Sequence, residues 1–352
     1  AGDDRHIVDY LAEEVLTLQS DQILNFLLQT SILSRLSEPL CDFVTHMKGS
    51  QKILDGLEKA NLFIVPLDNK RCWYRYHHLF ADLLRRRLHQ KDSVLVPELH
   101  RRASQWYEKN SLKDEAIDHA LGAGDFTRAA ELIQEHVDAT WLHGEHTKLW
   151  RWLEELPAEI AFSRPQLSIL HAWDQLANGQ QNAAELSLKA AEEALDPRTN
   201  RAAEISSMAP YPLSGADRRK LRGRIAATRA LGASYRGDVA GIIQYAQQAL
   251  ESLPEEDSAW RSTAAMALGD AHSIQGEMAV AHQARLEALE ASKATGNLYL
   301  IMLTSLRLSV TLRQRGRLQQ VLTICRHLMQ LAEENGLGQT AMAGWLLTTW
   351  GE

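Results

Sequence analysis

Four glycine turns in the second half of the chain constrain its fold more than any other feature. They lie at Gly179, Gly237, Gly276 and Gly316, and each separates two segments rich in helix-forming residues. The last two intervals are 39 and 40 residues, whereas the first is 58 residues, about 18 more than one repeat. Residues 196–214 contain three prolines and little periodicity, so we assign the extra length to an insertion there.

Small side chains keep the same register around these glycines. Seven residues before them lie Ala172, Ala230, Gly269 and Ser309, and twelve residues after them lie Ala191, Ala249, Ala288 and the larger Leu328. Small residues let two antiparallel helices approach closely, and helix pairs of this kind stack into a superhelix. The pattern L-G-x6-G ending at Gly276 is typical of tetratricopeptide repeats, although the period exceeds their usual ~34 residues. A superhelix of tetratricopeptide-like helix pairs is therefore predicted.

The first part of the chain has a different pattern. Asp21 is placed to N-cap a helix, and two further helices are predicted around 38–47 and 51–60. The segments LFIVPL (62–67) and CWYRY (72–76) predict two β-strands joined by a polar turn, with another helix from His77. Three helices, a hairpin and a helix predict a winged-helix unit, so the chain as a whole is expected to be mainly α.

We divide the chain into four segments on this basis. The winged-helix domain is predicted over 1–92, the first part of the helical repeats over 93–195, the insertion or linker over 196–214, and the rest of the superhelix over 215–352. From Pro97 onward only helices are expected, and no proline follows Pro254.

Composition excludes several classes of protein. The formal net charge is −7, which argues against a chain that mainly coats nucleic acid. No apolar run approaches the roughly 18–20 residues that span a bilayer, and the acidic N-terminus does not resemble a signal peptide. Three widely separated cysteines predict neither a disulfide framework nor a zinc site. We expect a cytoplasmic protein with no membrane partner.

Enzyme motifs are missing from the sequence. There is no GxxxxGK[ST] segment, and GAG at 122–124 follows a predicted helix rather than a strand, so it is interpreted as a helix end with Asp125 capping the next helix. HGEH at 143–146 is not HExxH, and no carboxylates complete a metal site. We therefore predict no catalytic residues, no metal and no cofactor in this chain.

The repeat register suggests one candidate binding surface. Trp173 lies six residues before Gly179 on the first helix of its repeat, a register that faces the concave side of a tetratricopeptide superhelix. Asp270, Ser273 and Arg313 share that side and could hold a sugar or another small metabolite beside the aromatic ring. The alternative for these four residues is packing between repeats, with solvated polar side chains.

Arg85, Arg86 and Arg87 raise the possibility of a DNA-recognition helix. Three consecutive helical residues point about 100° apart and cannot form one stripe, so a solvated or domain-contacting helix end is favoured. No direct DNA binding by this chain is expected.

Several motifs in one order resemble a known family. WYRYHHLFADLLRRRL (73–88), IVDYLAEEVL (7–16), FLLQTSIL (26–33), ANLFIVPLD (60–68), LHRRASQWYEKN (99–110), EAIDHALGAGDFTRAAELIQ (115–134) and LWRWLEELP (149–157) are similar to the MalT-like regulators. These are ATP-dependent LuxR-class transcriptional activators within the STAND NTPases. The resemblance covers residues 4–195 strongly and the later repeats by period.

The resemblance implies a function for the whole protein. Family members join an N-terminal P-loop NTPase domain, a winged-helix domain, a helical-repeat sensor and a C-terminal helix-turn-helix. Only the middle two match here, so we expect a central fragment of such a regulator. A small-molecule inducer or regulatory protein would bind the repeats, and the winged-helix unit would relay that signal to an NTPase domain in cis, which binds ATP or ADP and favours self-association.

His77 takes a particular role from this resemblance. In related STAND proteins a Met-His-Asp motif enters the final winged-helix helix, and its His reaches the ADP phosphate. Tyr76, His77, His78 and Leu79 match that place, with Tyr and His in place of Met and Asp. A histidine that fixes the strand-to-helix corner is the structural alternative. For the whole chain, a free-standing protein-interaction scaffold and a winged-helix DNA reader remain alternatives.

Overall fold

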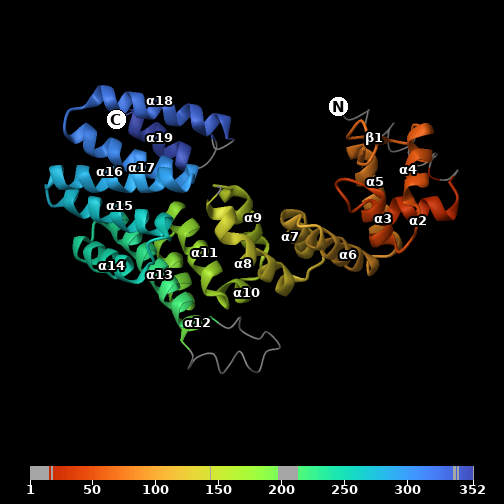
Figure 1. Ribbon diagram of the computed structural model, residues 1–352, viewed down its shortest axis with the longest axis horizontal. Helices are drawn as coiled ribbons and strands as arrows, with labels where there is room; N and C mark the ends of the chain where they lie inside the picture. Colours follow the sequence, from red (N-terminus) through yellow and green to blue (C-terminus); the bar gives the residue numbers. More distant parts are fainter. Residues whose placement is uncertain are drawn as a thin grey trace. The chain divides into compact units, whose positions relative to one another are not determined.

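The computed structural model describes residue 16, residues 19–142, 144–196 and 213–335, residue 338 and residues 341–351. Helices and one two-stranded antiparallel hairpin make up this part of the chain, as Figure 1 shows, which confirms the mainly α prediction. Residues up to 133 form one compact unit and residues from 134 onward form another. The four predicted segment boundaries stay predictions, and residues 197–212 of the predicted insertion lie outside the described residues.

The winged-helix unit has the predicted order of elements. It comprises α2 (Asp21–Thr30), α3 (Glu38–Thr45), α4 (Ser50–Lys59), β1 (Ile64–Pro66), β2 (Tyr74–Tyr76) and α5 (His78–Lys91). Ile64 pairs with Tyr76 across the hairpin, and Leu36 adds a bridge to Tyr74 on the other edge of β2. One prediction was wrong by a residue: Ser20, not Asp21, caps α2 by accepting the Ile23 N–H, and Asp21 is the first helical residue.

The hairpin is attached to the helices through two tyrosines. The Tyr76 hydroxyl lies 2.7 Å from Thr30 Oγ1, and both groups are buried. Tyr74 Oη donates to Asp55 in α4 at 3.1 Å. Phe80, the third residue of α5, stacks on Phe63 with ring centroids 5.0 Å apart. These contacts hold the start of α5 directly against the end of β2.

Three helices follow the winged-helix unit: α6 (Leu95–Lys109), α7 (Lys113–Gly122) and α8 (Phe126–Leu142). Pro97 lies in the first turn of α6, and Leu99, Ala103 and Tyr107 form its buried face. Asp125 Oδ1 accepts the Arg128 N–H at 3.2 Å, which confirms the predicted cap of α8.

Helix pairs occupy the rest of the described chain. They comprise α9 (His146–Glu155), α10 (Ala158–Phe162), α11 (Pro165–Ala177), α12 (Gln181–Leu195), α13 (Gly215–Arg236), α14 (Val239–Ser252), α15 (Ser258–Ile274), α16 (Met278–Thr295), α17 (Leu298–Gln314), α18 (Leu318–Glu334) and α19 (Ala341–Gly351). The four turn glycines, which separate α11 from α12, α13 from α14, α15 from α16 and α17 from α18, all have positive φ, between 69° and 83°. Left-handed backbone is the conformation that glycine adopts at least cost, so the predicted turns are confirmed.

The small residues of the repeat register lie at helix contacts. Ala172, Ala230, Ala191, Ala249, Ala288 and Ser309 are fully buried. A Cβ added at Gly269 in α15 would lie 2.8 Å from Arg285 Cγ in α16. A side chain at Gly269 would therefore displace Arg285 from its place against α15.

An aromatic cluster fills the centre of the second unit. Trp141, Trp173 and Trp260 pack ring against ring with centroids 5.2 to 5.5 Å apart. His146 joins them, 4.6 Å from Trp141 and 4.5 Å from Tyr299. These side chains come from α8, α9, α11, α15 and α17, so one aromatic core connects repeats distant in sequence. Within the described part of the chain, no helix combines the length and the apolar character needed to cross a bilayer.

Candidate ligand-binding site

A cavity of about 740 Å³ opens in the second unit. The first helices of the repeats supply most of its wall: the end of α11, then α13, α17 and α19. Its principal lining residues are Leu176, Tyr235, Leu303, Leu306, Arg307 and Trp345. The repeat order thus brings residues more than 150 positions apart to one surface, and the volume is in the range of small-molecule sites.

The cavity wall is mixed in character. Leu176, Leu303 and Leu306 are apolar, and the rings of Tyr235 and Trp345 lie 6.0 Å apart in an edge-to-face arrangement. Thr348 and Thr349 add side-chain hydroxyls from α19. A few polar groups on a mainly apolar surface are what an orienting small-molecule site requires.

Arg307 is the charged side chain of this wall. Its guanidinium carbon lies 5.1 Å from the centre of the Tyr235 ring, and its Nη1 lies 3.4 Å from Asp270 Oδ2. Burial disfavours the charged form, but Asp270 and Tyr235 outweigh that effect and raise the Arg307 pKa. Arg307 is therefore a permanent cation at the cavity surface.

Asp270 connects Arg307 to a second arginine behind the wall. Arg285 Nη2 donates to Asp270 Oδ1 at 2.6 Å, and the Ser234 hydroxyl donates to Asp270 Oδ2. Arg285 also donates to Thr311 in α17. Burial lowers the pKa of Arg285 in spite of the neighbouring Asp270. The network joins α13, α15, α16 and α17 directly beneath the cavity.

The four residues predicted for a ligand groove occupy different environments. Trp173 is 1% exposed in the aromatic core, and Asp270 is 3% exposed and reaches the cavity through Arg307. Ser273 is half-buried and donates to Gln314 at 3.3 Å, and Arg313 is half-buried in α17. None of the four is among the described residues that line the cavity, and their role in binding stays a prediction.

Sequence reasoning missed the residues that do line it. One signal was present for Arg307, which is the lone charged residue in the apolar segment LYLIMLTSLRLSVTL (298–312). A charge in a buried helix needs a partner or a function. No pattern in the sequence indicated that Tyr235 and Trp345, 110 positions apart, would meet.

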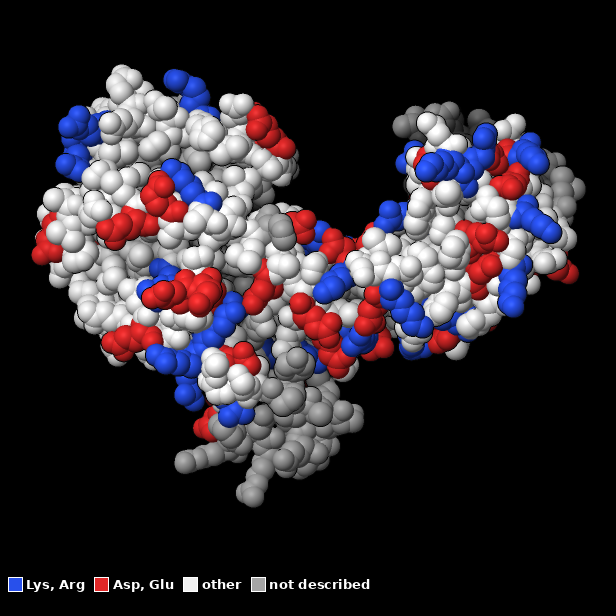
Figure 2. Space-filling model, in the orientation of Figure 1, with Lys and Arg blue, Asp and Glu red and all other residues white. Residues whose placement is uncertain are grey.

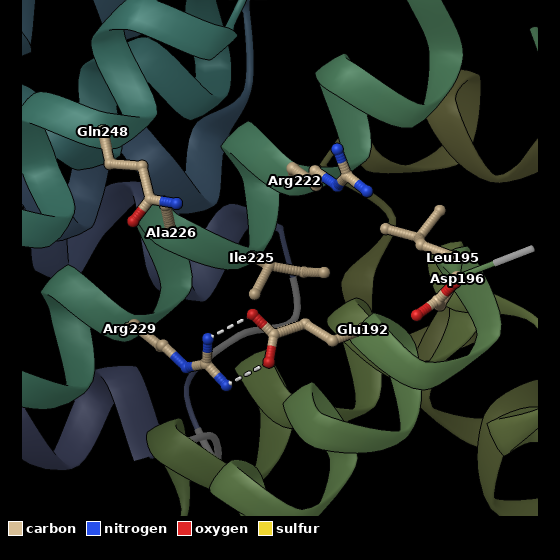
Figure 3. Close-up of a pocket in the computed structure, with 8 residues that line it drawn as sticks. All are labelled: Glu192, Leu195, Asp196, Arg222, Ile225, Ala226, Arg229 and Gln248. Carbon is tan, nitrogen blue, oxygen red and sulfur yellow. Dashed lines mark hydrogen bonds and ion pairs between the residues drawn. The ribbon is translucent and has the colours of Figure 1, made fainter. Parts of the chain in front are cut away.

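A second cavity of about 620 Å³ lies between α12, α13 and α14 (Figure 3). Arg229 points into it, but two carboxylates already bind its guanidinium. Glu192 accepts at 2.5 and 2.9 Å, and Glu185 accepts at 2.9 Å. The charge of Arg229 is therefore satisfied within the protein, and the other charged lining residues, Arg222 and Asp196, are of opposite sign, which makes this cavity the weaker candidate for a ligand site.

His77 and the arginines of α5 lie in the first unit. His77 is the exposed N-cap residue of α5, its N–H donates to Phe63 O at 2.7 Å, and its ring packs 4.4 Å from that of His78. Arg85 binds Ser31 O and Asp82, each at 2.9 Å. Figure 2 shows basic and acidic side chains interspersed on the face in view. Within the described residues no group of three or more His, Cys, Asp or Glu could hold a metal ion.

Comparisons with known proteins match both units. Residues 12–96 match the MalT winged helix domain, and residues 223–352 match the MalT-like TPR region. The chain is 29% identical over 344 residues to the HTH-type transcriptional regulators MalT of Yersinia pestis (strain Pestoides F) and Yersinia enterocolitica serotype O:8. The match covers 97% of this chain and 36% of each relative, so the chain spans about a third of their length.

One solved structure has a similar fold over nearly the whole chain. It is a Signal Transduction ATPase with Numerous Domains protein with a tetratricopeptide repeat sensor, from Pyrococcus horikoshii. The TM-score is 0.55 at 16% sequence identity, and the match covers 97% of this chain and 48% of that one. At this identity the likeness concerns the fold.

Proposed function

Because this MalT-like chain joins a winged-helix domain to a tetratricopeptide region, we propose that it is the signal-sensing and relay part of a transcriptional regulator. In this proposal the repeat superhelix binds a small-molecule or protein signal. The winged-helix unit then couples binding to an NTPase domain that lies outside these 352 residues and takes ATP or ADP.

The cavity formed by α11, α13, α17 and α19 is the observation that carries the proposal. Its wall comes from helices of different repeats, so a ligand there would contact several repeats at once. A ligand shifts an equilibrium only by its difference in affinity for the two states. A site that depends on the curvature of the superhelix supplies such a difference, because a change in curvature moves its walls relative to one another.

The start of α5 supports the relay half of the proposal. His77 is exposed at the N-terminus of a 14-residue helix, where backbone N–H groups and the helix dipole favour anions. In the proposed whole protein, its imidazole contacts the nucleotide phosphate, as the resemblance to related STAND proteins implies. The buried contacts of Tyr76 and Phe80 hold this corner in place.

Sequencing the DNA on both sides of this coding segment tests the proposal first. A P-loop domain upstream and a helix-turn-helix domain downstream are expected. Start and stop codons directly at the two ends would contradict the proposal and leave a free-standing repeat protein.

A variant that fills the cavity then tests the sensing role in the whole regulator. Ala177 lines the cavity, and Ala177→Trp places an indole in it, whereas Ala240 is an exposed residue of α14 and Ala240→Trp is the matched control. Some transcripts will change in level when the gene is deleted. The levels of these transcripts should change in the same direction with Ala177→Trp and stay at wild-type values with Ala240→Trp. Wild-type transcript levels with Ala177→Trp would contradict a sensing role for the cavity.

A further inference from the structure

The cavity beside Arg307 carries an unbalanced positive charge. Among the described residues that line it, Arg307 is the one ionised side chain, and there is no carboxylate. Its ion pair with Asp270 lies behind the wall and uses Nη1 at 3.4 Å. A guanidinium has five N–H donors in a fixed planar arrangement, so the contacts with Asp270 and with the Tyr235 hydroxyl leave donors for a ligand.

Asp270 does not neutralise Arg307 fully, because it has a closer cationic partner. Arg285 is 3% exposed and donates to Asp270 at 2.6 Å. Two arginines therefore share one carboxylate in a buried environment. Asp174, on α11, is not among the described lining residues. Its carboxylate accepts a hydrogen bond at 3.0 Å from Asn178, a neutral residue of the lining.

The second cavity provides a comparison within the same molecule. Arg229 lines that cavity. Its guanidinium donates to the carboxylates of Glu185 and Glu192 at 2.9 Å or less. Arg229 with two carboxylates has no need of an external anion, and the other charged residues of that lining, Arg222 and Asp196, are of opposite sign. Arg307 has the opposite ratio, because it shares one carboxylate with Arg285.

We propose that the cavity of α11, α13, α17 and α19 takes an amphipathic anion, a carboxylate, sulfonate or phosphate on an aromatic or other apolar body. The anionic group would pair with Arg307. The apolar body would have the rings of Tyr235 and Trp345 on one side and the leucines of α17 on the other. This inference rests on the proposed sensing function and narrows the class of signal. It disfavours neutral polar ligands, which leave the cation without a counter-charge.

Two fluorescent probes of the same shape test the inference on the 352-residue chain. The anionic probe is 8-anilinonaphthalene-1-sulfonate, and the neutral probe is N-phenyl-1-naphthylamine, which lacks the sulfonate. Titration of each into the wild-type protein should give saturable binding, with the anion bound at least about tenfold more tightly, since a charge-assisted hydrogen bond contributes on the order of 1.5–3 kcal/mol. Equal affinities, or no saturable binding of the anion, would overturn the inference.

Substitutions then locate the bound anion. Arg307→Gln should weaken the sulfonate probe about tenfold or more and leave the neutral probe unchanged, whereas Arg307→Lys should retain most of the preference. Arg229→Gln is the matched control in the second cavity and should change neither affinity. Loss of sulfonate binding with Arg229→Gln rather than Arg307→Gln would overturn the assignment to this cavity.

The same titrations separate this inference from the proposed function. Ala177→Trp should block both probes. If both probes bind with equal affinity and Ala177→Trp blocks both, the cavity is a ligand site without anion preference, and only the present inference fails. If neither probe binds to the wild-type protein, both the anion preference and the proposed ligand-binding role of the cavity fail.

Discussion

His100 and His119 show how burial sets the protonation of a single pair of side chains. Their Nδ1 atoms lie 2.9 Å apart, so one ring donates and the other accepts. Burial lowers the pKa of His100 to about 4 and that of His119 to about 3. A proton added to this pair would place a charge in the buried space between α6 and α7, and protonation of both rings would set two Nδ1–H donors against each other.

The histidine pair predicts acid sensitivity of the first unit. The unfolded chain binds protons near the ordinary histidine pKa of about 6.5, whereas the folded chain does not until about pH 4. The contribution of the neutral pair to the free energy of unfolding is therefore present above about pH 6.5 and is lost as pH falls towards 4. The free energy of unfolding, measured with urea between pH 7 and pH 4.5, should fall as the pH falls. His119→Gln should reduce the slope of this pH dependence. His78→Gln, at an exposed position, is the control, and an unchanged slope in His119→Gln would contradict the assignment.

His77 leads to a prediction about nucleotide binding in the proposed whole protein. His77→Ala should weaken ADP binding about tenfold, because the proposed hydrogen bond from the imidazole to the charged phosphate is removed. His78→Ala should leave it within about twofold. Isothermal titration of ADP into the two variants measures the difference, and equal affinities would remove His77 from the nucleotide site.

At the scale of elements, Asn297 connects repeats that are far apart in sequence. Its Oδ1 caps α17 by accepting the Leu300 N–H at 3.1 Å and also accepts from His146 Nε2 at 3.2 Å. Its Nδ2 donates to Trp141 O at 2.6 Å. One buried amide thereby holds the end of α8, the start of α9 and the start of α17 together.

This arrangement predicts that Asn297→Ala is far more destabilising than the loss of an exposed cap. Removing the amide takes one hydrogen bond from Trp141 O and one from the Leu300 N–H, and both groups are buried. This loss costs on the order of 2–3 kcal/mol of unfolding free energy. Ser214 caps α13 at the surface through a capping box, and Ser214→Ala should cost about 1 kcal/mol or less. Urea denaturation of both variants measures the costs, and equal losses would show that the buried contacts add nothing.

The elements themselves were largely predictable. The hairpin, α3, α4 and α5, and the helix pairs around each turn glycine, follow from hydrophobic periodicity and left-handed glycines, which act within a few residues of the chain. The cap of α2 was placed one residue late, because Ser20 and Asp21 are both good capping residues and local sequence does not decide between them.

At the scale of the whole molecule, the sequence of the chain, which combines a winged-helix domain and a tetratricopeptide region, contains no GxxxxGK[ST] motif. We expect the purified 352-residue chain to hydrolyse ATP no faster than a buffer control. We also expect it not to bind duplex DNA sequence-specifically. A colorimetric phosphate assay and a fluorescence-anisotropy titration with two unrelated duplexes measure these outcomes. Clear ATP turnover would contradict the proposal that the NTPase domain lies outside these 352 residues.

The binding surface was the hardest feature to predict. Trp173 and Asp270 were assigned to the concave side from their register, and the structure buries both, one in the aromatic core and one between two arginines. Register tells which helix faces inward, but it does not tell how deep a side chain lies. That depth depends on the sizes of residues contributed by other repeats.

Sequence by itself determined the architecture of this protein. The repeated glycines and the small residues at fixed offsets specify tetratricopeptide-like pairs, and the order of three helices, a hairpin and a helix before them specifies a winged helix, because both patterns act through local conformation and neighbouring-helix contacts. Tertiary structure alone decided the site. Arg307, Tyr235 and Trp345 meet because the superhelix turns α11, α13, α17 and α19 towards one cavity, and the charge left on Arg307 depends on a second arginine that competes for Asp270. Such long-range competition has no signature in the spacing of residues along a chain.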